Sequence, residues 1–242
     1  MIKAVVFDLD NTLYSYDKAH SFAYRVIREY AERTFGWTEK EFDRRHHEAM
    51  QEIFNRLGDV AATHNRVLRY QRMIELAGLP LHPYVLDMND LYWGAFFAVS
   101  RPYPGALEAL DFIRSKGMKV GIATNMTAQH QFVKLSRMNF LPLIDFMVSS
   151  EETITEKPNS QVFLRCAEKA GAKPDECLMI GDSVQHDIHG AICAGLKAIW
   201  VRAEVESDEK TYSDDVVDGV PILYRFRDIE SVMMENGFLR DS

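Results

Sequence analysis

Cysteine is scarce in this sequence, and its spacing excludes a disulfide framework. The 242 residues include only Cys166, Cys177 and Cys193, and no two of them stand in a CxxC spacing. An odd and sparse set of thiols fits a reducing compartment better than a disulfide-stabilised secreted protein. The sequence therefore favours a cytoplasmic protein.

Long apolar runs and an excess of positive charge are also missing. The apolar run at the N-terminus is interrupted by Asp8, and no stretch approaches the length of a transmembrane span. The formal net charge is -8, which makes nucleic acid and anionic membranes poor partners. If the ligand is itself an anion, its site must be locally positive or hold a metal. The sequence does not predict an oligomeric state.

The residues that are present predict a doubly wound, Rossmann-like α/β fold with a parallel sheet. Five short runs are nearly all apolar, which is typical of strands covered on both faces. Helical patterns ending at glycines lie between them, at 106–116, from 159 or 160 to 170, and from about Asp187 to Gly195. A last amphipathic helix begins near Ile229 and closes at Gly237. The predicted strands are 5–7, 119–123, 146–149, 177–180 and 198–201.

The stretch between Leu13 and Phe97 breaks this alternation. Its apolar residues recur with helical spacing and no strand pattern interrupts them, so it predicts an all-helical insert of four helices. Pro102–Gly105 reads as the hinge by which the chain returns to the sheet. We therefore predict a catalytic α/β core formed by 1–14 and 99–242, and a helical domain formed by 15–98. The acidic segment Glu204–Asp218 is expected to be a surface loop.

Two carboxylates stand where the first predicted strand ends. Asp8 and Asp10 follow Val5–Phe7, and residues two apart in a strand lie on the same face. Two like charges so close repel each other unless a cation or a shared proton relieves them. A single aspartate here would read as an ordinary turn, but the rest of the chain favours a functional pair.

Polar residues also follow the other predicted strands. The ligand crevice of an open parallel sheet lies beyond the carboxyl ends of its strands, so these residues are expected on one rim with Asp8 and Asp10. Each alone could be a helix cap, a surface lysine or a turn, but their joint placement predicts an active site. They are Thr124–Asn125 after the second strand, Lys157–Pro158 before the helix that follows the third, and Gly181–Asp182–Ser183 after the fourth.

In order and spacing, these segments resemble the four motifs of the haloacid dehalogenase superfamily. The resemblance spans almost the whole chain, because the helical insert also resembles that family's first type of cap domain. The fourth motif commonly carries asparagine before its last aspartate, whereas this chain has His186 before Asp187. The matching segments are Asp8–Thr12, Thr124–Asn125, Lys157–Pro158 and Gly181–Asp187.

The four motif carboxylates predict a hard cation. Asp8, Asp10, Asp182 and Asp187 would come together with Lys157 as the only cation that the motifs supply. Oxygen ligands of this kind select Mg²⁺ over zinc. The resemblance implies that Asp8 and Asp182 bind this metal through their side chains and Asp10 through its backbone carbonyl. Asp187 would hold a metal-bound water or orient its neighbours.

The resemblance further implies phosphoryl transfer to a protein carboxylate. Asp8 would be the nucleophile and form an aspartyl-phosphate. The Thr124 hydroxyl and the Asn125 backbone N–H would bind the transferred group, and Lys157 would neutralise its charge.

Asp10 would protonate the leaving oxygen and then take a proton from the attacking water. Dehalogenases and phosphonate-cleaving relatives lack an aspartate at this place, so Asp10 favours a phosphate monoester. The expected substrate is a small phosphorylated metabolite, such as a sugar phosphate or nucleoside monophosphate, because a helical lid would close over the site.

Two other functions remain open at this point. A phosphomutase would use the same core and pass the phosphoryl group to a sugar, and a non-catalytic binding protein could keep the fold without turnover. Arg66, Arg69 and Arg72 recur every three residues in the helical insert. They could contact an anionic substrate, but the pattern favours a solvated helix face.

Overall fold

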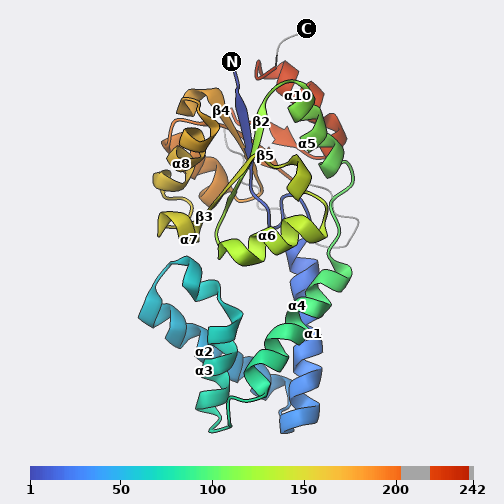
Figure 1. Ribbon diagram of the computed structural model, residues 1–242, viewed down its shortest axis with the longest axis vertical. Helices are drawn as coiled ribbons and strands as arrows, with labels where there is room; N and C mark the ends of the chain where they lie inside the picture. Colours follow the sequence, from blue (N-terminus) through green and yellow to red (C-terminus); the bar gives the residue numbers. More distant parts are fainter. Residues whose placement is uncertain (203–218, 240–242) are drawn as a thin grey trace.

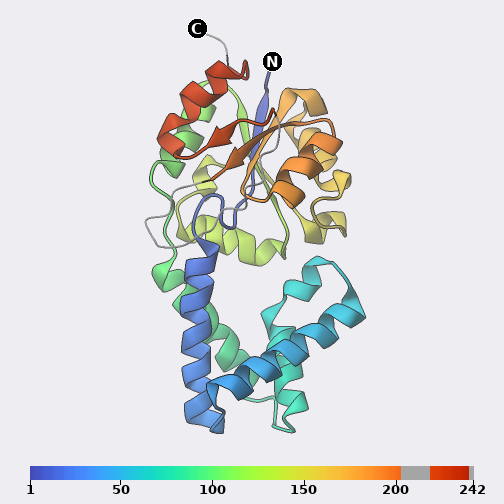
Figure 2. The same ribbon diagram turned by 180° about the vertical axis from the view of Figure 1, so that it is seen from behind.

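The computed structural model describes residues 1–202 and 219–239, which form a parallel sheet with helices on both faces and a helical extension at one end (Figure 1, Figure 2). The strands lie in the order β3-β2-β1-β4-β5-β6, and every neighbouring pair is parallel. The predicted doubly wound fold is confirmed. The strands are β1 (Ala4–Phe7), β2 (Lys119–Thr124), β3 (Phe146–Ser149), β4 (Cys177–Gly181), β5 (Lys197–Val201) and β6 (Ile222–Leu223).

The order of the strands places the site at the centre of the sheet. Strands β2 and β3 extend from β1 in one direction, whereas β4, β5 and β6 extend in the other. The direction of winding therefore reverses at β1, and crevices at such reversal points lie beyond the carboxyl ends of the strands. Asp8 directly follows β1 and so stands at this point.

Strand β1 is apolar throughout because helices cover both of its faces. Val5 and Phe7 belong to the core shared with α5 (Ala106–Ser115) and α10 (Ile229–Glu235). The alternate residues Ala4 and Val6 belong to a second core against α8 (Ser160–Ala170). Side chains on a strand point to opposite faces in turn, so a strand buried on both sides carries no polar alternation.

The segment between β1 and α5 is helical, as predicted. Helices α1 and α4 lie side by side and connect the helical extension to the sheet domain (Figure 1, Figure 2). The chain leaves the sheet domain just before α1 and returns to it just after α4. These two segments are joined by a β-bridge between Tyr14 and Pro102 and by a hydrogen bond of 2.9 Å from the Tyr103 N–H to the Leu13 carbonyl. The elements are α1 (Tyr16–Phe35), α2 (Glu39–Leu57), a 3₁₀ turn η1 (Ala61–His64), α3 (Arg66–Leu76) and α4 (Tyr84–Val99).

Local signals set the ends of the first long helix. The Ser15 hydroxyl accepts a hydrogen bond from the Lys18 N–H at 3.3 Å, which satisfies one of the donors that a helix start leaves free. The helix ends at Gly36, whose φ of 71° is left-handed and costs glycine little. The start at Ser15 puts Tyr16 in the first turn of α1, where its ring centre lies 5.2 Å from Lys134 Nζ.

Three features differ from the sequence expectation. The helix expected from about Asp187 begins earlier, with a wide π turn at Val184–His189 that leads into α9 (Gly190–Cys193). Strand β6 has only two residues and was not predicted, because so short a run carries no pattern. Helix α6 (Ala128–Arg137) was not predicted either, because two of its three buried residues, Gln131 and Lys134, are polar.

Two further expectations concern exposure and membranes. The expected acidic surface loop at Glu204–Asp218 lies outside the described residues. Among the residues that are described, none of the helices has both the length and the hydropathy needed to cross a bilayer.

Candidate active site

The carboxyl ends of the central strands bring three of the four predicted carboxylates together. Asp8 follows β1, and Asp182 follows β4. Asp187 returns to the same place from the π turn. One oxygen from each of the three lies within 4.8 Å of an oxygen of the other two. Asp8 and Asp187 are buried, with 6% and 1% of their surface exposed, so their charges have little help from water.

Lys157 binds two of these three carboxylates. Its Nζ donates to Asp8 Oδ1 at 2.6 Å, to Asp187 Oδ1 at 2.7 Å and to the Ala123 carbonyl at 2.9 Å. The side chain is 3% exposed, and these contacts use all three N–H donors of the ammonium. The lysine is therefore held in one position, between the carboxylate that ends β1 and the carboxylate of the π turn.

The group as a whole is short of positive charge. Burial raises the pKa of Asp8 to about 8 although Lys157 lowers it, because Asp187 and Asp182 add like charge. Burial opposes the charge on Lys157, but Asp187 and Asp8 outweigh it and raise the lysine pKa above its usual value. One ammonium therefore does not offset three carboxylates, and a further cation would keep Asp8 ionised near neutral pH.

Hydrogen bonds of the Thr12 side chain and of the Ser183 backbone N–H help to position the three carboxylates. Thr12 Oγ1 lies 3.1 Å from both Asp8 Oδ2 and Asp182 Oδ1, and it accepts a hydrogen bond from the Asp182 N–H at 3.0 Å. Asp187 Oδ2 accepts from the Ser183 N–H at 3.0 Å. A side chain on Gly181 would overlap the Asp187 carboxylate, so β4 must end in glycine for the π turn to close. Thr12 was not among the predicted site residues.

Thr124 and Asn125 reach the rim from the end of β2. The Asn125 side chain binds the backbone of Lys157, accepting from its N–H at 2.8 Å and donating to its carbonyl at 3.2 Å. The Thr124 hydroxyl accepts a hydrogen bond from Gln131 Nε2. Asn125 thus positions the lysine. The hydroxyl proton of Thr124 remains available for a ligand, because its oxygen serves as the acceptor in the bond with Gln131.

The carboxylate of Asp10 turns to a different partner. Lys134 Nζ binds both of its oxygens, at 2.8 Å and 2.6 Å, and Tyr14 Oη donates to Oδ1 at 2.5 Å. Lys134 comes from α6 and has no exposed surface. The motif residues supply only Lys157, but the structure adds this second buried cation. The signal that could have located it is a lysine on the face of α6 that must pack against the sheet.

Lys134 also contacts the helical extension. Its Nζ lies 5.2 Å from the ring centre of Tyr16, 5.7 Å from that of Phe96 and 5.9 Å from that of Trp93. Aromatic faces stabilise a buried cation. His130, also on α6, stacks on Trp93 with ring centres 4.6 Å apart. The Asp10–Lys134 pair is therefore enclosed jointly by the sheet domain and by α1 and α4.

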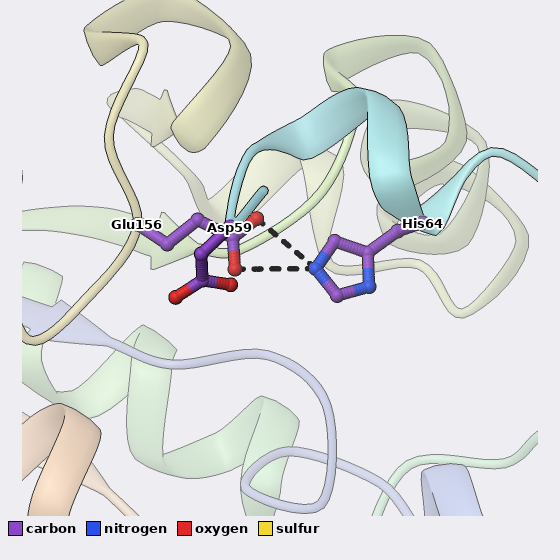
Figure 3. Close-up of side chains that lie close together, drawn as sticks. All are labelled: Asp59, His64 and Glu156. Carbon is purple, nitrogen blue, oxygen red and sulfur yellow. Dashed lines mark hydrogen bonds and ion pairs between the residues drawn. The ribbon is translucent and has the colours of Figure 1, made fainter. Parts of the chain in front are cut away.

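Besides the contact at Lys134, a second contact joins the helical extension to the sheet domain. Figure 3 shows His64 of η1 directed at Glu156, with Asp59 beside it. His64 Nε2 lies 3.0 Å from Glu156 Oε1 and 3.1 Å from Oε2. Burial is the largest influence and raises the pKa of Glu156, but the interaction with His64 and the hydrogen bonds with Asp59 and Ser150 together outweigh it, and the net pKa is lowered. Because Glu156 directly precedes Lys157, this contact reaches the edge of the carboxylate group.

The three arginines of α3 do not share one environment. The expected solvated face is wrong for Arg66, which is 5% exposed and donates to the hydroxyls of Tyr16 and Tyr92, each at 2.6 Å. Arg72 forms the surface pairs expected of a solvated residue, with Glu52 at 2.5 Å and Glu75 at 3.3 Å. A spacing of three places residues on one broad face of a helix but does not tell how deeply each is covered.

Comparison with known proteins adds independent evidence. Residues 2–195 match the haloacid dehalogenase-like hydrolase family. The chain is 32% identical over 216 residues to a ribulose-1,5-bisphosphate 5-phosphatase of Halopiger xanaduensis, covering 88% of this chain and 90% of the relative. It is also 32% identical over 219 residues to a glyceraldehyde 3-phosphate phosphatase of Methanopyrus kandleri, covering 90% and 91%.

A solved structure supports the fold. A 2-haloacid dehalogenase from Pseudomonas syringae pv. Tomato aligns with a TM-score of 0.75 over 96% of this chain and 98% of that chain, at 20% identity. At that identity the likeness concerns the arrangement of the elements alone.

Proposed function

The chain belongs to the haloacid dehalogenase-like hydrolase family, and we propose that it is a Mg²⁺-dependent phosphatase that hydrolyses a small phosphate monoester through an aspartyl-phosphate. Curated relatives that align along most of its length are named phosphatases, which gives the class of enzyme. The observation that carries the finer proposal is the group formed by Asp8, Asp182 and Asp187, two of which, Asp8 and Asp187, bind Lys157.

The donor set of this group fits Mg²⁺. It offers carboxylate oxygens without thiolate or imidazole, and hard oxygen donors favour Mg²⁺ over zinc. Asp8 and Asp182 would hold the ion through their side chains, with the backbone carbonyl of Asp10 as a third ligand. When bound, the ion would neutralise charge on the carboxylates and on the phosphoryl oxygens. Asp187 has both oxygens engaged, by Lys157 and by the Ser183 N–H, so its proposed work is to position the lysine.

In the first step, a carboxylate oxygen of Asp8 forms a bond to phosphorus while the bond from phosphorus to the alcohol oxygen breaks. For this step Asp10 must carry a proton on one oxygen, so one of the hydrogen bonds that its carboxylate accepts from Lys134 or Tyr14 is given up, and that proton passes to the departing alcohol oxygen. Lys157 stabilises negative charge on the transferred group because its ammonium already lies 2.6 Å from the nucleophile. The Thr124 hydroxyl and the Asn125 backbone N–H would donate to the phosphoryl oxygens.

In the second step, water attacks the phosphorus of the aspartyl-phosphate and the bond to Asp8 breaks. Asp10, now ionised, takes the proton from the water, and inorganic phosphate leaves. The carboxylate of Asp10 is ready for this role because Lys134 holds its ionised form in one orientation. The same two residues therefore serve both steps, Asp8 as the carrier and Asp10 as acid and then base.

We further propose that residues 15–98 act as a cap domain over a core formed by 1–14 and 99–242. The extension meets the core at Lys134, which binds Asp10, and at Glu156, which directly precedes Lys157. An enclosing cap suits a small phosphorylated metabolite such as a sugar phosphate, and a lid of this kind excludes water from the reaction. The sparse free thiols are consistent with action in the cytoplasm.

The test compares leaving groups in the Asp10→Asn variant. If Asp10 protonates the departing oxygen, the variant should lose alkyl phosphate hydrolysis by ~100-fold or more beyond its loss for an activated aryl phosphate. A burst of phenol followed by slow turnover is expected, because the water then lacks its base.

Equal losses for both ester types without a burst would contradict the role of Asp10. Transfer of the phosphoryl group to an added sugar in preference to water would instead identify a phosphomutase. The absence of turnover on a broad panel of phosphate esters would leave only the non-catalytic alternative.

A further inference from the structure

Arg66 is a buried cation that the proposed chemistry does not use. It begins α3, and its Nη2 makes the two hydrogen bonds to the Tyr16 and Tyr92 hydroxyls. The guanidinium carbon lies 4.0 Å from the ring centre of Tyr92 and 4.7 Å from that of Trp93. All the hydrogen bonds that Arg66 makes within the described chain come from Nη2, so Nε and Nη1 remain for another acceptor.

The charge of Arg66 is not balanced by an acid. Within residues 1–202 and 219–239, neither Arg66 nor Arg69 forms an ion pair with a carboxylate, and burial raises the pKa of the neighbouring Tyr70 and Tyr92, so these two hydroxyls stay neutral near pH 7. Among the described residues, Arg69 donates only to the Thr63 carbonyl, at 3.1 and 3.3 Å. An unpaired buried charge is costly unless something compensates it, and a bound anion would do so.

Histidines around the two arginines report the same excess of positive charge. Burial, followed by Arg66 and Arg69, lowers the pKa of His20 to about 4. Burial, followed by Arg66 and Lys134, lowers that of His130. Neither imidazole can add to the charge near neutral pH, and neither can neutralise it. The region is therefore electropositive in a chain whose net charge is -8.

A second donor without a partner lies beside Arg66. Trp93 is 8% exposed, and its indole N–H is buried without a hydrogen-bond partner in the described part of the chain. Buried N–H groups of this kind are normally satisfied, so an orphaned one marks a place for an acceptor. An uncompensated guanidinium and an unpaired indole N–H on neighbouring side chains both call for an oxygen atom with negative charge.

The place of Arg66 is next to the reaction centre. Tyr16 and Trp93 contact Arg66 on one side and Lys134 on the other, and Lys134 holds Asp10. His64, two residues before Arg66, contacts Glu156 beside Lys157. Arg66 therefore shares aromatic neighbours with Lys134 and lies on the Asp10 side of the site. That is where the alcohol part of a phosphate ester would extend.

We propose that Arg66 and the indole N–H of Trp93 form a subsite for a second anionic group on the alcohol part of the substrate, either a carboxylate or another phosphate. This inference rests on the proposed phosphatase function and names its substrate class. The curated relatives differ on this point by name, since one acts on a bisphosphate and the other on glyceraldehyde 3-phosphate. The subsite predicts that this chain prefers substrates with a second anionic group besides the phosphate that is hydrolysed, which are called doubly anionic here.

The test uses pairs of esters that differ only in the second group. One pair is 3-phosphoglycerate and glycerol 3-phosphate, which probes a carboxylate, and the other is ribulose 1,5-bisphosphate and ribulose 5-phosphate, which probes a phosphate. The wild-type protein should favour the doubly anionic member of at least one pair, which identifies the source of the charge. Arg66→Gln should lower kcat/KM for the preferred ester by about 10- to 100-fold, mainly by raising KM. It should change kcat/KM for the other ester of the pair little.

Arg72→Gln is the matched control. It removes the same kind of side chain from the same helix at a site already paired with Glu52 and Glu75, and it should leave the preference unchanged. Trp93→Phe keeps the ring beside Arg66 but removes the N–H, and it should reduce the same preference by about 3- to 10-fold. This second variant tests the subsite even where Arg66→Gln does not fold.

Two results would overturn the subsite. One is an equal loss for both members of each pair in Arg66→Gln and in Trp93→Phe, which would make these residues structural only. The other is a wild-type protein that does not favour, in either pair, the ester with the second anionic group. Calorimetry of the same four compounds binding to the Asp8→Asn variant distinguishes failure of the subsite from failure of the phosphatase proposal. A difference in affinity within a pair needs no turnover, so it tests the subsite alone.

Discussion

Breaking the buried pair between Lys134 and Asp10 should cost stability in an asymmetric way. Lys134 has no exposed surface, whereas the Asp10 side chain is 24% exposed and also has Tyr14 as a partner. Removing the acid therefore strands a charge that water cannot reach, but removing the lysine leaves a carboxylate that water and a phenol can still solvate. Breaking a buried pair from one side costs ~3–5 kcal/mol.

We expect Asp10→Ala to lie in that range and Lys134→Met to cost less, about 2–3 kcal/mol. The double variant should cost less than the sum of the two, with a coupling of about 1.5–3 kcal/mol, because the second change removes the charge that the first has stranded. The assay is urea-induced unfolding of the wild type and the three variants in metal-free buffer, so that cation binding does not contribute.

The surface pair of Arg44 and Glu48, 3.2 Å apart and with side chains 61% and 46% exposed, is the control. Its cycle should show no coupling beyond error, because exposed pairs contribute little. Additive losses in the Asp10 and Lys134 cycle, within ~0.5 kcal/mol, would refute the reasoning. So would a greater loss in Lys134→Met than in Asp10→Ala, since the order follows directly from the burial of the lysine.

Three further predictions concern chemistry and pH. Hydrolysis of an aryl phosphate should require Mg²⁺ and stop when a chelator removes it, and full activity in metal-free protein would exclude the proposed metal role of Asp8 and Asp182. Asp8→Asn should fold but lose at least ~10³-fold in kcat, measured with the same ester and checked by circular dichroism. His20 has a folded pKa of about 4 against an ordinary 6.5, so its contribution to stability is intact above pH 6.5 and declines as the pH falls toward 4. Unfolding midpoints measured across that window should fall less in His20→Gln, and an NMR titration of His20 in Arg66→Gln should place its pKa nearer the ordinary value.

The sheet could be predicted from the sequence because burial on both faces leaves a direct trace. Val5 and Phe7 face one core and Ala4 and Val6 the other, so the whole of β1 is apolar. The rim followed from topology, since the carboxyl ends of parallel strands meet. Membership of the family could be predicted from the same motifs, and the match over residues 2–195 confirms it.

Lys157 was predicted from its motif, but the other two buried cations near the site, Lys134 and Arg66, could not be placed in this way. Lys134 and Gln131 lie on the buried face of α6, where a polar residue removes the apolar periodicity that would have indicated the helix. Arg66 and Arg72 belong to the same run of arginines, one every three residues. Arg66 is buried against Tyr16 of α1 and Tyr92 of α4, which bind its guanidinium, whereas Arg72 is not. Both cases depend on contacts between residues distant in sequence, which local patterns do not record.

The central claim is that Asp8 carries the phosphoryl group between substrate and water. The most direct test is to mix the protein with a radiolabelled phosphate monoester and Mg²⁺, quench with acid within a single turnover, and map the label on the peptides. We expect label on the peptide that contains Asp8, appearing before free phosphate, and none on Asp8→Asn. Release of phosphate at the full rate with no protein-bound label at any time would show that water attacks the ester directly, and it would contradict the account.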